Sequence, residues 1–233
     1  MSKFTSNRAI LVLEAPWELD PDDANRTSVL PFIEGIAKLT GDTEVHYANF
    51  YDERSFQMAL DCLCKGSFDS RTVYIAAHGF KRSIGGMDII TLLTHIALKS
   101  KKYHITGVLL GSCFVGGNAT SMEVCLQESS LRWCVGYASE TQWLEGTLID
   151  CAIMAHMSAL EDDVFDHRER IADELARAIH LYRADFPIGD DYAGEPVRLA
   201  DSLRFVAQPR GRGNRARDIS ALVWAQHGES PVG

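Results

Sequence analysis

Two residues able to do nucleophilic and proton-transfer chemistry follow apolar segments in the middle of the sequence. His78 comes directly after VYIAA, and Cys113 comes directly after VLLGS. A cysteine thiol becomes an effective nucleophile when a neighbouring imidazole takes its proton, and histidine suits that task because its unperturbed pKa is near 6.5. Gly79 allows close approach of the backbone, and the N–H groups of Gly79 and Cys113 are candidates for an oxyanion hole. The predicted chemistry is covalent catalysis by a thiolate.

The segments around these residues predict the framework that must position them. Short apolar runs, typical of buried parallel strands, occupy residues 9–15, 43–50, 71–80, 105–113 and 131–139. Helical patterns lie between or after them, and Gly41 stands where a C-terminal cap belongs. This alternation predicts an α/β fold with a mostly parallel sheet sandwiched between helices. The 35 residues from His78 to Cys113 are enough for one crossover helix. If the two strands are neighbours, both residues emerge at the same edge of the sheet.

Composition excludes several classes of protein. The chain has 233 residues and a formal net charge of -9, which argues against a general nucleic-acid binder. The N-terminal residues contain no apolar run of signal-peptide length, and no segment reaches the roughly 18 apolar residues of a membrane span. We therefore expect a cytoplasmic protein without a membrane partner. The six cysteines are expected to be reduced thiols. We expect a main domain over residues 1–185 and a partly loop-like C-terminal extension over 186–233.

Other site types match the sequence poorly. A hydrolase elbow would read Gly-x-Cys-x-Gly, whereas Gly111 and Gly116 bracket Cys113 with one residue too many. A phosphate-binding loop would need Lys and Ser or Thr where Gly117 and Asn118 stand. Cysteine and histidine do not cluster with zinc-ligand spacing. We therefore expect no cofactor and no metal.

The two strand-end motifs, AAHGF and LLGSCFVGG, resemble those of the caspase-like peptidases. This group contains caspases, legumains, separases, gingipains and bacterial CHAT domains, and the resemblance covers residues 9–184. The segment VGYASETQW is similar to the CHAT-type pattern after the nucleophile strand, which makes that pattern the nearest match. The sequence departs from caspases in lacking Gln-Ala-Cys and in a His–Cys spacing below the usual ~50 residues, so aspartate specificity does not carry over.

The resemblance implies roles for individual residues. His78 becomes the general acid/base, Cys113 the nucleophile and Gly79 an oxyanion donor. The pocket for the residue before the cut is expected to include Ser139, Glu140 and Trp143. An acid there, Glu140 or Asp150, would favour a basic residue, whereas a pocket lined by Trp143 would favour an apolar one. Glu14 is a candidate for orienting His78, with a solvated strand-end acid as the alternative.

These observations lead to a functional hypothesis and its rival. The hypothesis is a thiol protease, a hydrolase that cleaves a protein or peptide substrate through a His–Cys dyad and an acyl-enzyme. The rival is a catalytically silent caspase-like interaction module in a bacterial regulatory or defence system. The sequence leaves open whether an activating protein partner is needed.

Overall fold

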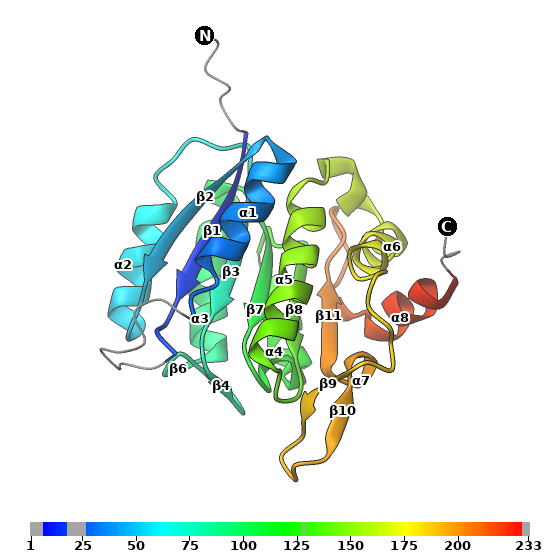
Figure 1. Ribbon diagram of the computed structural model, residues 1–233. Helices are drawn as coiled ribbons and strands as arrows, with labels where there is room; N and C mark the ends of the chain where they lie inside the picture. Colours follow the sequence, from blue (N-terminus) through cyan, green and yellow to red (C-terminus); the bar gives the residue numbers. More distant parts are fainter. Residues whose placement is uncertain (1–6, 18–26, 128, 230–233) are drawn as a thin grey trace.

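The computed structural model describes residues 7–17, 27–127 and 129–229, and in this part of the chain seven strands form one sheet. The strand order is β12-β11-β8-β7-β3-β1-β2 (Figure 1). The five strands β2, β1, β3, β7 and β8 are mutually parallel, and β11 and β12 complete the sheet in antiparallel pairings. The bounds are β1 Arg8–Glu14, β2 Thr43–Asn49, β3 Ser70–Ala76, β7 Ile105–Gly111, β8 Trp133–Tyr137, β11 Leu203–Ala207 and β12 Arg217–Asp218. The predicted α/β fold with a mostly parallel sheet is confirmed.

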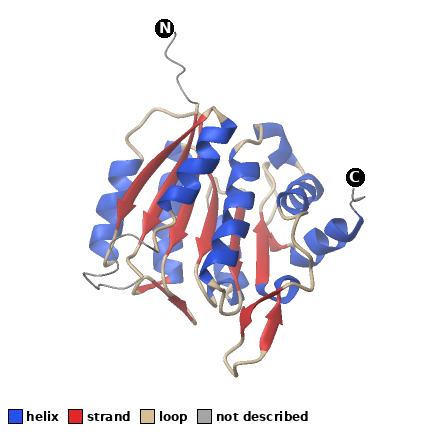
Figure 2. Cartoon of the chain, in the orientation of Figure 1, coloured by secondary structure: helices blue, strands red, loops and turns tan. Residues whose placement is uncertain are grey.

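Helices cover both faces of the sheet, as Figure 2 shows. On one face α2 (Glu53–Leu63), α3 (Ile89–Tyr103) and α4 (Ala119–Gln127) enclose a hydrophobic cluster, here called the first core. On the other face α1 (Leu30–Thr40), α5 (Trp143–Ser158), α6 (Arg168–Ala178) and α8 (Ser220–Glu229) enclose the second core. None of the described helices is both long and apolar enough to cross a membrane.

The central strands are apolar on both faces because they contribute to both cores. In β3, Val73 and Ile75 belong to the first core, whereas Tyr74 and Ala76 belong to the second. Successive side chains of a strand point to opposite faces, so a strand covered by helices on both sides needs an almost continuous apolar run. β3 and β7 are parallel neighbours with Ala76 opposite Gly111, so their carboxyl ends coincide. This confirms that the strands preceding His78 and Cys113 are adjacent.

Local capping fixes where the neighbouring helices begin and end. Asp88 caps α3 by accepting a hydrogen bond from the Ile90 N–H at 2.9 Å. Gly41 closes α1 in the left-handed conformation with φ of 77°, as the sequence predicted. Between β3 and α3 the chain forms a small three-stranded sheet of β4 (Gly79–Phe80), β5 (Ser83–Ile84) and β6 (Met87–Asp88).

Residues after 185 contribute regular structure to the same sheet. A hairpin of β9 (Pro187–Asp190) and β10 (Pro196–Arg198) precedes the short helix α7 (Leu199–Ser202) and strand β11. β11 pairs with β8, and α8 packs Val223 into the second core. The basic stretch 209–218 is anchored by Arg210, which forms ion pairs with Asp162 and Asp166.

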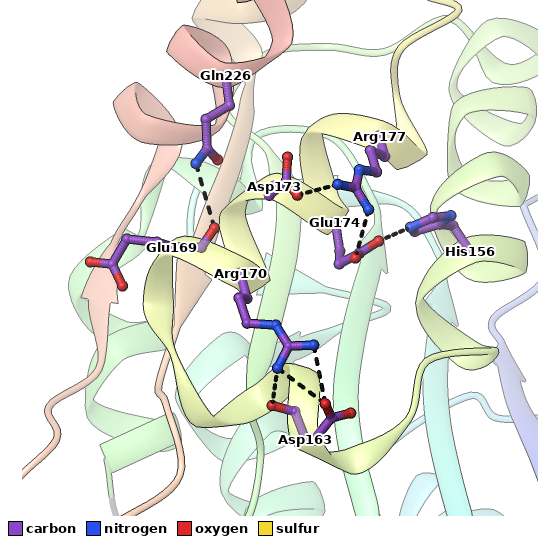
Figure 3. Close-up of polar contacts among 8 residues, drawn as sticks. All are labelled: His156, Asp163, Glu169, Arg170, Asp173, Glu174, Arg177 and Gln226. Atoms are coloured by element: carbon purple, nitrogen blue, oxygen red, sulfur yellow. Dashed lines mark hydrogen bonds and ion pairs between the residues drawn. The ribbon is translucent and has the colours of Figure 1, made fainter. Parts of the chain in front are cut away.

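Polar contacts attach α6 to the helices on either side of it (Figure 3). Glu174 lies between His156 of α5, at 2.6 Å, and Arg177 of its own helix, at 3.0 Å. Further pairs join Arg177 to Asp173, Arg170 to Asp163, and the Gln226 side chain of α8 to the Glu169 carbonyl. These contacts join α6 to α5, to α8 and to the 3-10 turn over Asp162–Asp166 that precedes it.

Candidate active site

His78 stands two residues beyond the end of β3, with its ring exposed. Its Nε2 lies 2.8 Å from the Trp17 carbonyl oxygen, and the two rings meet edge to face with centroids 4.8 Å apart. A carbonyl oxygen can only accept, so the neutral ring carries its hydrogen on Nε2 in this contact. Nδ1 is then the basic nitrogen, and the main chain before α1 holds the ring in that tautomer.

Glu14, the candidate for orienting His78, has other partners. Its carboxylate accepts hydrogen bonds from Ser28 Oγ at 2.7 Å, the Val29 N–H at 3.0 Å and the Tyr47 hydroxyl at 2.8 Å. The residue is only 2% exposed, so it is not a solvated acid either. Glu14 satisfies donors at the start of α1, and the Trp17 carbonyl is the group that contacts His78.

Cys113 follows β7 by two residues and is half-buried against the segment after β8. Its Sγ lies 3.4 Å from the Thr141 amide nitrogen and 3.9 Å from the Thr141 carbonyl oxygen. Burial raises the pKa of the thiol, and the negative charges of Glu140 and Asp150 act in the same direction, while the Thr141 N–H opposes them. These surroundings therefore favour the protonated thiol, and the sulfur contacts the Thr141 main chain.

The loops after β3 and β7 are in direct contact. Ser112 Oγ donates a 2.6 Å hydrogen bond to the Ala77 carbonyl. A Cβ placed on Gly79 would lie 2.2 Å from the Cys113 carbonyl oxygen and 3.1 Å from its amide nitrogen, so only glycine fits. The N–H of Phe114 bonds to the Ser139 carbonyl at 2.9 Å. The structure thus places the residues after His78 against the backbone of Cys113.

A cavity of about 500 Å³ opens beside both residues. Aromatic rings form much of its wall, and two carboxylates, Glu140 and Asp150, border it. Its lining consists of Trp17, Thr27, Tyr74, His78, Gly111, Ser112, Cys113, Tyr137, Glu140, Thr141, Gln142, Trp143, Gly146, Thr147 and Asp150. The buried indole nitrogens of Trp17 and Trp143 have no hydrogen-bond partner among the described residues.

Asp150 is the buried acid of this cavity. Its carboxylate accepts hydrogen bonds from the hydroxyls of Tyr74 and Tyr137, each at 2.8 Å. Burial raises its pKa to about 7, although the two tyrosine hydrogen bonds act to lower it. The group is therefore divided between its neutral and charged forms near neutral pH.

Of the three residues expected in the pocket, Glu140 and Trp143 line the cavity and Ser139 does not. The Ser139 side chain is buried, with its Oγ 2.7 Å from the Ser202 hydroxyl and donating to the Glu140 carbonyl. Trp17 and Thr141 contact the candidate dyad through main-chain atoms, which sequence reasoning missed because such contacts do not depend on residue type. Three or more His, Cys, Asp or Glu side chains do not gather into a potential metal site anywhere in the described residues.

Comparison with known proteins identifies the fold. Neither a protein-family model nor a curated protein matches the chain. Among solved structures, it is similar to a secreted C11 cysteine protease from Bacteroides thetaiotaomicron bound to an irreversible peptide inhibitor, with a TM-score of 0.54 and 12% identity over 86% of this chain. A structure of the B. thetaiotaomicron protease called iotapain gives a TM-score of 0.52 and 10% identity over 87% of this chain.

The fold is that of the caspase-like cysteine proteases. The expected caspase-like fold is thereby confirmed, whereas the CHAT-type pattern is not. The chain spans about two thirds of the length of both proteins, 66% and 67%. At 10–12% identity the likeness concerns the fold alone.

Proposed function

We propose that this protein is a cysteine peptidase whose nucleophile is Cys113 and whose proton-transfer group is His78. The observation that carries the proposal is that both residues follow adjacent parallel strands and line the same cavity. The contact between His78 Nε2 and the Trp17 carbonyl supports it further, because this contact leaves Nδ1 free to accept a proton.

The proposed reaction proceeds through an acyl-enzyme. Cys113 gives its proton to His78 Nδ1, and the thiolate attacks the substrate carbonyl carbon. The N–H groups of Gly79 and Cys113 stabilise the oxyanion. The C–N bond breaks as His78 returns the proton to the leaving amine, which leaves a thioester on Cys113. Water, deprotonated by His78, then releases the acid and restores the thiol.

The cavity is the proposed pocket for the residue before the cut, and we propose that it prefers arginine or lysine. Glu140 and Asp150 supply negative charge, and the rings of Trp17 and Trp143 offer faces for a cation. A bound guanidinium would also favour the charged form of Asp150, whose pKa burial otherwise raises. A profile favouring apolar residues would instead assign the specificity to the tryptophans.

One observation favours the silent interaction module. The Cys113 sulfur is covered by the Thr141 main chain, and burial raises its pKa. Both features lower the reactivity of the resting thiol, although Cys113 still lines the cavity. A partner protein that moves residues 139–143 would act as an activator.

Mass-spectrometric labelling by an arginine-containing peptidyl acyloxymethyl ketone tests the proposal. We expect labelling at Cys113 that is abolished by Cys113→Ala and reduced at least tenfold by His78→Ala. Cys62→Ala is the matched control, because Cys62 is an exposed cysteine on α2. Equal labelling of Cys113 with and without His78, or labelling spread over several cysteines, would instead identify a module that keeps only the fold.

A further inference from the structure

Three aromatic side chains from three separate elements meet next to the candidate dyad. Phe80 lies two residues after His78, Phe114 directly follows Cys113, and Tyr192 lies in the turn between β9 and β10. The rings of Phe114 and Tyr192 stack with centroids 4.1 Å apart and planes 13° apart. Phe80 meets them edge-on, 6.2 Å from Phe114 and 5.8 Å from Tyr192. We call these three residues the aromatic platform.

The platform is exposed and separate from the cavity. Phe80 is 56% exposed and Tyr192 is 60% exposed, and none of the three residues lines the cavity. β4 and the β9–β10 hairpin both extend past the carboxyl ends of the central strands (Figure 1). An exposed aromatic group of this kind is typical of a binding surface.

The backbone holds part of the platform in an unfavourable conformation. Phe114 has φ of 64°, in the left-handed region that a bulky residue rarely adopts. Such a strained conformation recurs at binding and catalytic sites. The same residue anchors the Cys113 loop through its N–H bond to the Ser139 carbonyl. Phe114 therefore connects the nucleophile loop to the platform.

The course of a bound peptide connects the platform to the cut. When the side chain before the scissile bond fills the cavity, the scissile carbonyl lies at Cys113. The loops that directly follow Cys113 and His78 carry Phe114 and Phe80, and we expect the chain after the scissile bond to pass over these loops. Residues on the leaving-group side thus meet aromatic rings as soon as they leave the dyad.

We propose that the aromatic platform binds an aromatic or large apolar side chain at the first or second position after the scissile bond. This inference rests on the proposed peptidase function and adds the substrate class on the leaving-group side. Tyr192 is a specificity-determining residue, because its ring completes the surface from an element distant in sequence. The partner is a peptide with an apolar residue after the cut.

Two steps test the inference. A proteome-derived peptide library, read on both sides of each cut, first gives the preferred sequence before the scissile bond. Two internally quenched peptides then share that sequence and carry either Phe-Phe or Gly-Gly after the cut. The measured quantity is the ratio of their kcat/KM values, for the native protein and for Tyr192→Ala, Tyr192→Phe and Tyr51→Ala.

The ratio separates substrate binding from a merely structural role. We expect the native protein to favour Phe-Phe, Tyr192→Ala to lower the ratio about fivefold, and Tyr192→Phe to retain it. Tyr51→Ala is the matched control, since Tyr51 is also 60% exposed but lies directly before the N-cap residue of α2. If the platform only fixes the loops, Tyr192→Ala slows the cleavage of both peptides alike. An unchanged ratio of kcat/KM values in Tyr192→Ala would therefore overturn the inference, whereas cleavage of the peptides would still support the peptidase proposal. Absence of both cleavage and Cys113 labelling removes the peptidase proposal and the inference with it.

Discussion

Burial changes the acid–base chemistry of Asp150, one of the two carboxylates that border the cavity. Its side chain is buried beneath the cavity and bonded only to two tyrosine hydroxyls among the described residues. Burial raises its pKa to about 7, whereas an aspartate in an unfolded chain has a pKa of about 3.9. Because the folded-state pKa is the higher one, its proton stabilises the folded protein below about pH 4. This contribution is lost as the pH rises through about 7.

We therefore predict that Asp150→Asn becomes more stable relative to the native protein as the pH rises. A shift of about three pKa units corresponds to roughly 3–4 kcal/mol in unfolding free energy between pH 4 and pH 8. Asparagine stays neutral at every pH, and its Oδ1 can accept from one tyrosine hydroxyl while its amide N–H donates to the hydroxyl oxygen of the other. Urea unfolding of both proteins at several pH values measures the difference, and a difference independent of pH would show that Asp150 is already ionised in the fold.

At the level of single residues, the sequence predicts candidate groups whose proposed roles depend on side-chain chemistry. His78 and Cys113 were identifiable because each ends an apolar strand, and a parallel sheet brings such ends together. Glu14 was assigned to the site from its position at the end of a strand, and Ser139 from the family resemblance; their actual partners, Val29 and Ser202, depend on how distant loops pack.

At the level of elements, Arg71 connects the start of β3 to the segment that precedes this strand and to the end of α3. Its guanidinium is buried and donates to the carbonyls of Phe68 at 3.0 Å and Tyr103 at 2.6 Å, and also to that of Gly66. Tyr103 is the last residue of α3, so the cation also neutralises the carbonyl end of that helix. One side chain thus ties the β3 strand to the α2–β3 connection and to α3.

We predict that Arg71→Met lowers the unfolding free energy by about 2–4 kcal/mol, because three main-chain carbonyls lose a charged donor that is itself buried. Arg54→Met is the matched control, since Arg54 is an exposed arginine on α2, and its effect should stay within about 0.5 kcal/mol. Urea denaturation followed by circular dichroism measures both. Equal effects of the two substitutions would mean that solvent replaces the Arg71 contacts.

The predictability of the elements follows from how each one is buried. Strands β3 and β7 are covered on both faces, so their apolar runs are unmistakable. β11 has only five residues and comes directly after the short helix α7, so no long pattern indicates it. The apolar spacing of residues 165–184 is typical of one long helix, whereas the structure has a 3-10 turn over Asp162–Asp166 and a helix α6 that ends at Ala178. Apolar periodicity alone does not record where a helix ends.

At the level of the whole molecule, the two cores share one sheet, and this arrangement bears on residues 186–233. β11 contributes Val206 to the first core and Phe205 to the second, and α8 adds Val223 to the second. Segments that share cores in this way unfold together in a small protein. The C-terminal segment is therefore expected to unfold with the rest of the described chain.

Val223→Asp tests that cooperativity. A carboxylate in the second core should lower the unfolding free energy by about 3–5 kcal/mol, because burial of an unpaired charge is costly. Ala225→Asp places the same group on an exposed position of α8 and should cost about 0.5 kcal/mol or less. Tryptophan fluorescence and far-ultraviolet circular dichroism should report one coincident urea transition for both variants, shifted to lower urea in Val223→Asp. Val223→Asp could instead unfold in two separated transitions, with Cys113 still labelled after the first. That result would show that residues 186–233 form a unit that the rest of the fold does not need.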